Sequence, residues 1–418
     1  MKVCDFQLFT DRNLPRDFLK TYGSAWVTPN SHQWSDPIKR HREYEDTLQE
    51  LTLASELGFD GICINEHHNS LFSTNPAPNV FATALSQRTT DTALCVMGNQ
   101  IAGRGEPLRV AEEIAMLDIL SEGRTVSAFP VGISMDLNFT NGISGSKTRA
   151  RYAEALDLII KAWTNEGPFV YNGRFNKLRY VSPEPLPYQR PHPPIWLLGG
   201  ESVDSWERAI SNDWPFVFFT FNGAQFARPS IEMYWEAVDE MGRDRNPFRL
   251  GYLSLICVGE SDADVEKNFA DHVVNFFNIV QGTPLHFFDP PGYKTDRALR
   301  KSGASERLMK SIMEFQATPD NKKWSKILND GWVVAGTAES VAQQLEEQAK
   351  ELQFGRLTPI FQFASLPTEV ARKSLALFSE HLPRLQSMFE DQWEDKWWPS
   401  GARKKSPESI AAARANAK

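Results

Sequence analysis

The chain has 418 residues, of which 41% are hydrophobic and 23% charged, so it can bury a large core in one barrel or in two or three smaller domains. Its formal net charge of −8 argues against broad nucleic-acid binding. No apolar stretch approaches the roughly 20 residues that cross a bilayer. The first residues also lack a signal-peptide pattern, so we expect a cytoplasmic protein.

Short apolar runs alternate with helical patterns along most of the chain. Eight runs are predicted to be buried parallel strands: Val3–Phe9, Phe59–Ile64, Ala93–Met97, Thr125–Val131, Pro194–Leu198, Phe216–Thr220, Leu250–Val258 and Leu357–Phe363. Helices are predicted between them, among them Tyr44–Leu57, Asn79–Arg88, Leu108–Leu120 and Lys147–Trp163. This alternation predicts an α/β fold of parallel βαβ units. Eight units favour a (β/α)8 TIM barrel over residues 1–390, and no glycine-rich dinucleotide turn follows the first strand.

Three segments depart from the barrel pattern. The dipeptide Asn172-Gly173 predicts a hairpin turn. The aromatic stretch 275–331, after the seventh strand, is too long for a simple connection and is predicted to be a lid insertion. The loops 10–39 and 275–331 are expected to build the substrate pocket, whose substrate the sequence does not identify. Residues 391–418 form a C-terminal tail to which we assign no function.

The four cysteines are Cys4, Cys63, Cys95 and Cys257. They lie in or at the start of apolar strand-like runs, and none belongs to a Cys-x-x-Cys pair. We therefore expect buried, reduced thiols in a reducing compartment.

The tripeptide Glu66-His67-His68 stands at the end of the second predicted strand, where an α/β fold gathers its catalytic residues. Packing, acid–base chemistry and metal binding are all open to such a group. If the strand persists through Glu66, the two histidines point in opposite directions and are poor ligands for one metal ion. No second histidine pair supports a metal site, so none is predicted.

Two further segments predict an anion site. Arg109 lies in the first turn of the helix that follows Pro107, where free N–H groups attract anions. After the fifth strand, Gly199-Gly200 precedes Glu201, Ser202 and Ser205 at the start of another helix. Glycine permits close backbone approach and the serines offer hydroxyls, although Ser202 could serve only as an N-cap.

Taken together, these segments resemble the bacterial luciferase-like flavin-dependent monooxygenase family. Four blocks in order carry the resemblance: 65–68, 107–124, 194–205 and 336–341. The resemblance covers nearly everything from Met1 to about Leu385. It implies a (β/α)8 barrel that binds reduced FMN from a separate NAD(P)H:flavin reductase. The flavin then reacts with O2 to give a C4a-hydroperoxide that oxygenates an organic small molecule.

The resemblance also implies roles for individual residues. The catalytic histidine falls on His67, with Glu66 orienting or tuning it. The phosphate site falls on Arg109, Gly200, Glu201, Ser202 and Ser205. A non-proline cis peptide after the third strand is expected near Met97-Gly98-Asn99, with Asn99 reaching the polar edge of the flavin. A homodimer is also implied. Relatives often have a glycine- or arginine-rich turn after the fourth strand, and Phe129–Ser134 replaces it here, so flavin contacts at that turn are not assigned.

The implied chemistry suits the composition of the predicted loop mouths. Oxygen transfer from a flavin needs a dry, apolar cavity. Aromatic residues stand near the loop mouths: Phe6, Trp26, Phe72, Phe218, Phe219, Phe221, Phe287, Phe288 and Tyr293. An imidazole can move a proton at neutral pH. Alternatives are hydride transfer with the deazaflavin F420, a metal-dependent barrel hydrolase, or a non-catalytic flavin-binding protein.

Overall fold

Eight parallel strands close into a barrel in the computed structural model, which describes residues 1–15, 17–26, 31–200, 202–282, 285–287 and 289–417. They are β1 (Lys2–Gln7), β2 (Gly61–Ile64), β3 (Ala93–Met97), β4 (Thr125–Pro130), β7 (Ile195–Gly199), β8 (Phe216–Phe218), β9 (Leu250–Val258) and β11 (Arg356–Ile360). Each strand pairs with the next in this order, and β11 pairs with β1 to close the ring. The predicted TIM barrel and all eight of its strands are confirmed, with shifts of up to three residues at the strand ends.

A ninth strand, β10 (Val333–Gly336), was not predicted. It pairs in parallel with the second half of β9. Leu255 of β9 has Ile360 of β11 as one partner and Val333 of β10 as the other. Strand β9 thus has β11 on one side. On its other side it pairs with β8 along its first residues and with β10 along its last residues, so β10 extends the barrel wall toward the mouth.

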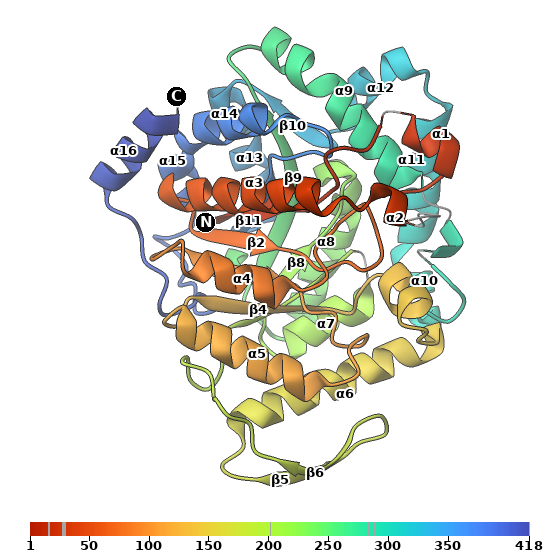
Figure 1. The fold of residues 1–418 in the computed structure, drawn as a ribbon, viewed down its shortest axis with the longest axis vertical. Coiled ribbons are helices and arrows are strands. Elements are labelled where there is room, and N and C mark those ends of the chain that lie inside the picture. The colour runs from red at the N-terminus through yellow and green to blue at the C-terminus, as the bar shows by residue number, and fades with distance from the viewer. Residues whose placement is uncertain (16, 27–30, 201, 283–284, 288, 418) are drawn as a thin grey trace.

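Helices surround the barrel: α3 (Pro37–Glu56), α4 (Pro78–Ser86), α5 (Pro107–Leu120), α6 (Gly145–Thr164), α7 (Val203–Ser211), α8 (Gly223–Glu240), α13 (Ala338–Leu352) and α14 (Thr368–Ser379) (Figure 1). Proline stands in the first turn of α3, α4 and α5, where its missing N–H costs nothing. Asp36 caps α3 by accepting hydrogen bonds from the backbone N–H of Ile38 and Lys39. One apolar cluster fills the space between the strands and these helices, and a second fills the barrel interior and its mouth.

The predicted hairpin is confirmed as β5 (Phe169–Asn172) and β6 (Lys177–Val181), which project from the barrel below α6 in Figure 1. The carboxylate of Glu154 on α6 holds the turn, since it accepts hydrogen bonds from the backbone N–H groups of Arg174, Phe175 and Asn176.

The stretch 275–331 contains several helices. These are the end of α9 (Asp262–Gln281), the 3-10 turn η3 (Leu285–Phe287), α10 (Asp296–Ser302), α11 (Ala304–Ala317) and α12 (Asp320–Asn329). Helices α10 and α11 lie at the right of Figure 1, as do the short helices α1 (Phe18–Tyr22) and α2 (Ser31–Trp34). Thr295 donates a hydrogen bond to Asp204 of α7 at 2.7 Å, and Tyr293 donates one to the backbone oxygen of Gly132 after β4. The insertion therefore covers the ends of β4 and β7.

The C-terminal segment crosses the opposite end of the barrel, where the strands begin. After α15 (Leu382–Gln386), Asp395 binds the buried guanidinium of Arg356 at the start of β11, with an N–O distance of 2.7 Å. The indole of Trp397 donates to Asp213 before β8, and the backbone N–H of Gly401 donates to Gly123 before β4. The chain ends as α16 (Pro407–Ala417), which packs on α3 and α14. This segment therefore closes the base of the barrel.

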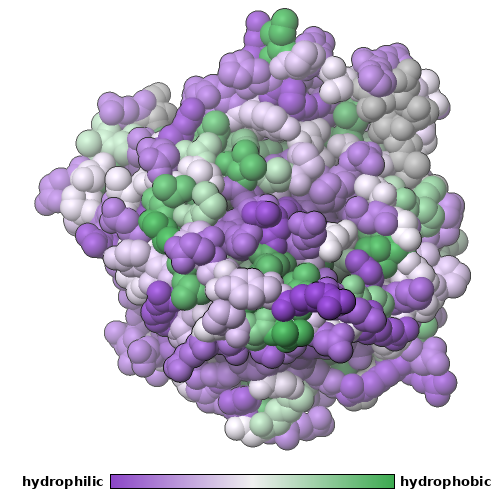
Figure 2. Space-filling view, turned by 60° about the horizontal axis from the view of Figure 1, so that its bottom comes forward, coloured by the Kyte–Doolittle hydropathy of each residue, from purple (hydrophilic) through white to green (hydrophobic). Residues whose placement is uncertain are grey.

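None of the described helices is long and apolar enough to cross a membrane. The face of the molecule in Figure 2 is mainly hydrophilic, with several small hydrophobic patches. Helices α4 and α5 carry four well-exposed apolar side chains, Val80, Met116, Ile119 and Leu120.

Candidate active site

His67 follows β2 at the barrel mouth and is fixed on two sides. Its Nδ1 lies 2.8 Å from the carboxylate of Asp136, and its side chain is 16% exposed. Its ring makes edge contacts with Trp26 and Phe72, with centroid distances of 5.0 and 5.7 Å. No hydrogen-bond partner of its Nε2 is found among the described residues. Because a carboxylate only accepts, the neutral imidazole carries its proton on Nδ1 and presents a lone pair at Nε2.

Asp136 is the residue that orients His67, and the sequence did not predict it. It lies in a π-helical turn after β4, Met135–Thr140, and its side chain is 1% exposed. Its two oxygens also accept hydrogen bonds from the backbone N–H of His68 (3.1 Å) and the amide of Gln100 (2.7 Å). Burial alone would raise the pKa of Asp136, but the adjacent His67 and the hydrogen bonds outweigh burial and lower it. The carboxylate is therefore an ionised partner for an imidazole that takes up a proton.

Glu66, which was expected to orient or tune His67, makes no hydrogen bond to it among the described residues. Its fully buried carboxylate instead lies 2.8 Å from Nε2 of His68 and accepts a hydrogen bond from the backbone N–H of Gln100. The hydrogen bond to Glu66 raises the pKa of His68. Gln100 also donates to Asp136, so Glu66 acts on His67 only through intermediates.

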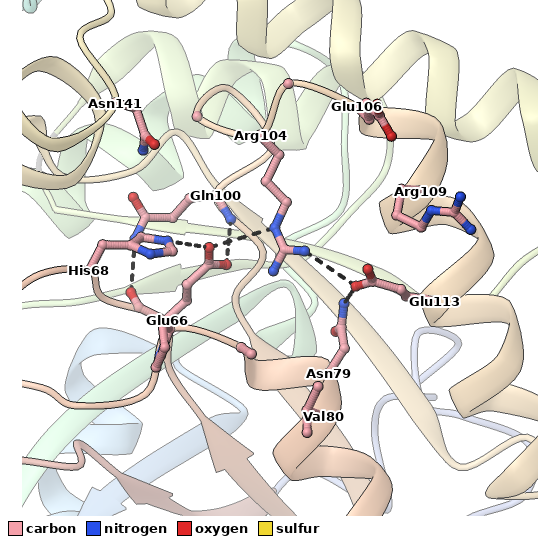
Figure 3. A pocket seen from close by; sticks show the side chains of 14 residues that line it. Glu66, His68, Asn79, Val80, Gln100, Arg104, Glu106, Arg109, Glu113 and Asn141 are labelled. Atoms are coloured by element: carbon pink, nitrogen blue, oxygen red, sulfur yellow. Dashed lines mark hydrogen bonds and ion pairs between the residues drawn. The ribbon is translucent and has the colours of Figure 1, made fainter.

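The two histidines point to different places, as predicted, although the strand does not continue to them. His67 contacts the rings of Trp26 and Phe72, which belong to an aromatic wall at the mouth. His68 instead lines a cavity of about 490 Å³ between the loops after β2 and β3 (Figure 3). Charged side chains line this cavity: Glu66, His68, Arg104, Arg109 and Glu113. Among the described residues, neither histidine belongs to a group of three converging metal ligands.

The predicted cis peptide is confirmed between Met97 and Gly98 at the end of β3. A Cβ at position 98 would collide with the backbone oxygen of Ala128, so only glycine fits there. The next residue, Asn99, is fully buried, and its amide exchanges two hydrogen bonds with the amide of Asn79 on α4. The structure therefore places the Asn99 side chain toward α4.

The residues predicted to form an anion site are only partly brought together, and the arginine that lies beside them is Arg149 rather than Arg109. Arg149 of α6 donates a hydrogen bond to the Ser202 hydroxyl at 2.9 Å, beside the start of α7. Ser202 occupies the N-cap position without a side-chain cap, so the capping interpretation of its hydroxyl is wrong. Ser205 is buried one turn later and Gly200 precedes the helix, while Glu201 lies outside the described residues.

Arg109 lies elsewhere. Its side chain is 64% exposed, pairs with Glu112 at 2.8 Å, and lines the same cavity as His68 from the opposite side (Figure 3). The sequence signal for Arg149 was weak, because an arginine in the first turns of a long helix is common. Its significance appears only when β7 brings Ser202 beside it.

The aromatic wall is mostly where it was predicted. Phe6, Trp26, Phe72, Phe219 and Phe221 belong to, or pack against, the interior cluster. Phe218 faces outward instead and packs on Trp206 and Tyr234, because side chains alternate along β8. Phe288 lies outside the described residues, and Phe287 contacts Phe139 after β4 at 4.7 Å between centroids.

One observation tests whether a phosphorylated flavin suits these residues. The Nε of Arg149 is buried and has no hydrogen-bond partner within the described part of the chain. A buried unpaired donor is costly, and an anion at the start of α7 would satisfy it. The Ser202 hydroxyl and the first N–H groups of the helix add further donors, so the donor set fits a phosphate group.

The fold and the site define a barrel protein with a histidine–carboxylate pair at its mouth. The family model of luciferase-like monooxygenases matches residues 24–354, and the chain belongs to this family. The oxygenase component of the flavin-dependent trigonelline monooxygenase of Acinetobacter baylyi is 27% identical over 184 residues, 43% of this chain and 49% of the relative. The chain spans about half the length of the curated relatives it matches.

Solved structures share the fold over almost the whole chain. The oxygenating constituent of 3,6-diketocamphane monooxygenase of Pseudomonas putida, in complex with FMN, has a TM-score of 0.65 at 16% identity, covering 91% of this chain and 97% of that one. An F420-dependent secondary alcohol dehydrogenase has a TM-score of 0.60 at 16% identity, covering 92% and 98%. These likenesses show the barrel fold.

Proposed function

We propose that the protein is the oxygenase component of a two-component flavin monooxygenase. It takes reduced FMN from a separate NAD(P)H:flavin reductase and inserts one atom of O2 into an organic small molecule. The observation that carries the proposal is the His67–Asp136 pair, in which Nε2 of His67 has no hydrogen-bond partner among the described residues and the ring packs against Trp26. The likeness to the trigonelline monooxygenase component and to the FMN complex of the diketocamphane enzyme supports the oxygenase role and the choice of FMN.

When bound, reduced flavin supplies the electrons that activate O2. The chain supplies the surroundings. His67 takes or gives a proton at Nε2, while Asp136 keeps Nδ1 protonated and stabilises the imidazolium. Trp26 and Phe72, whose rings stack at 4.0 Å, exclude water from this side of His67. Glu66 holds His68 and the backbone of Gln100 in place, and Gln100 in turn donates to Asp136, so Glu66 stabilises the His67–Asp136 pair indirectly.

Arg149, Ser202, Ser205 and the start of α7 would hold the FMN phosphate, with Gly200 allowing close backbone approach. The insertion 275–331 would act as the lid, since Thr295 already contacts Asp204 of the same helix. The exposed apolar side chains of α4 and α5 would form the homodimer interface, where Met116, Ile119 and Leu120 share one helical face.

The test combines flavin binding with product analysis. The apoprotein is titrated with FMNH2 and with reduced F420 under anaerobic conditions, and candidate substrates are then supplied with FMNH2 and O2. Binding of FMNH2 and a product mass increase of about 16 Da are expected for oxygen insertion. Reconstitution by F420 but not by FMN would refute the proposal. His67→Ala should cut turnover with little loss of FMNH2 affinity, and unchanged turnover would remove His67 from its role.

A further inference from the structure

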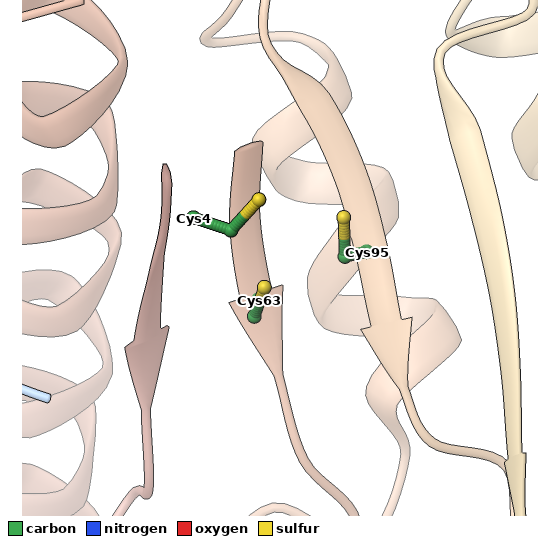
Figure 4. Close-up of side chains that lie close together, drawn as sticks. All are labelled: Cys4, Cys63 and Cys95. Carbon is green, nitrogen blue, oxygen red and sulfur yellow. The ribbon is translucent and has the colours of Figure 1, made fainter. Parts of the chain in front are cut away.

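Three cysteines converge inside the barrel. Cys4 of β1, Cys63 of β2 and Cys95 of β3 lie on adjacent strands, and Figure 4 shows their side chains grouped together. Their sulfur atoms all lie within 4.8 Å of one another. All three are free thiols and are buried, with exposures of 2% or less.

Gly61 makes room for this cluster. It pairs with Cys4 in the sheet and faces the barrel interior, like Cys63 two residues later. A Cβ at position 61 would lie 2.8 Å from the sulfur of Cys4 and 3.3 Å from that of Cys95. Any side chain there would therefore push the thiols apart, and only glycine allows all three to meet.

The dimensions and chemistry of the cluster suit a soft cation. With metal–sulfur bonds of about 2.3 Å, three sulfurs around one ion are roughly 4 Å apart, so the thiols need only a small contraction. No histidine, aspartate or glutamate joins the group among the described residues. An all-sulfur set of three favours Cu(I), whereas structural Zn²⁺ usually takes a fourth ligand.

Burial opposes ionisation of the three thiols and raises the pKa of Cys4 and Cys63. An ion that binds here must therefore displace their protons.

We propose that Cys4, Cys63 and Cys95 form a binding site for one soft monovalent cation of the Cu(I) type. The thiols lose protons to solvent as metal–sulfur bonds form, and the copper keeps its oxidation state. The ion joins β1, β2 and β3 at one point, directly below the segments that carry His67 and the Met97–Gly98 peptide. Because the sulfurs are buried, the ion enters during folding or through slow opening of the barrel.

The experiment measures copper in the full-length protein. Protein is produced in copper-supplemented medium, incubated with Cu(I) under ascorbate, and freed of weakly bound metal by a chelator. We expect one copper per chain, an X-ray absorption spectrum with only sulfur neighbours at about 2.3 Å, and a higher unfolding temperature than copper-free protein. Wild-type protein that retains no copper, or whose copper has nitrogen or oxygen neighbours, would overturn the proposal.

Matched variants locate the site. Cys63→Ser and Cys95→Ser should each lose at least nine tenths of the copper, whereas Cys257→Ser, which alters a buried thiol outside the cluster, should retain it. Gly61→Ala keeps all four thiols but fills the space between them, and should also lose the copper. Equal loss in Cys257→Ser and Cys63→Ser would contradict the site. The result does not depend on flavin binding, so it stands apart from the proposed function.

Discussion

Asp136→Asn tests the acid–base pair with a change of almost no volume. All three groups that contact the Asp136 carboxylate in the structure are donors: Nδ1 of His67, the amide of Gln100, and the backbone N–H of His68. An asparagine has one acceptor oxygen and one NH2 group. If its oxygen stays on the His68 N–H, its NH2 faces His67 and forces the imidazole proton from Nδ1 to Nε2.

The size of the effect follows from these contacts. The variant loses charge-assisted hydrogen bonds at a buried site, each contributing about 1.5–3 kcal/mol to stability. His67 in the wrong tautomer cannot accept a proton at Nε2, so we expect proton-dependent turnover to fall by about 10²- to 10⁴-fold. Because the pKa of Asp136 is lowered, its stabilising contribution is present above about pH 4 and is lost as pH falls through the folded pKa. Comparison near pH 7 therefore captures the full effect.

Two measurements check this prediction. Nitrogen-15 NMR of the histidine side chains should show the proton of His67 on Nδ1 in the wild type and on Nε2 in Asp136→Asn, without any need for a substrate. Turnover with FMNH2 and O2 should fall while FMNH2 affinity stays nearly constant. The reasoning is refuted if the tautomer is unchanged, or if it changes and turnover does not.

Three further changes test other parts of the structure. Arg149→Leu should weaken FMN binding about 10- to 100-fold but leave riboflavin binding unchanged, since riboflavin lacks the phosphate; Arg109→Leu is the exposed control and should have no effect in the same titrations. The raised pKa of His68 means that its contribution to stability is present below about pH 6.5 and is lost as pH rises through its folded pKa. Urea unfolding should therefore show a steeper fall in stability between about pH 6 and pH 9 for wild type than for His68→Gln, and equal slopes would contradict this. Asp395→Asn leaves the Arg356 guanidinium buried without its partner and should cost about 3–5 kcal/mol in unfolding free energy, a prediction that fails if the midpoint does not move.

The barrel strands could be predicted because each is a short apolar run between turn residues. Leu250–Val258 and Ala93–Met97 were predicted to the residue, since both runs are apolar and bounded by polar or glycine residues. Strand β10 was not predicted because its four residues, which directly precede a helix, are too few to show a periodic pattern. Its strand conformation depends on pairing with β9, a contact that local sequence does not encode.

The residues of the candidate site also differ in how far local sequence could predict them. The sequence could single out His67 and Ser202 as candidates because each lies shortly after a strand end, where residue type and position together carry meaning. Asp136 and Arg149 lie more than 50 residues from the partners they contact, His67 and Ser202 respectively, and only the closed barrel brings each pair together. Glu66 was expected to act on His67, but its carboxylate contacts His68, and the irregular backbone after Ile64 has no strand alternation from which this contact could be predicted.

The C-terminal segment that closes the base of the barrel has a consequence for biosynthesis. Until residues 395–401 leave the ribosome, the Arg356 guanidinium lacks its carboxylate, and the turns before β4 and β8 lack hydrogen bonds that the finished protein provides. The eight strands precede this segment in the chain and can pair before it is available, but the base of the barrel is then not yet covered. We expect full stability only after synthesis of this segment, so a stalled or truncated chain would present its interior to chaperones and proteases.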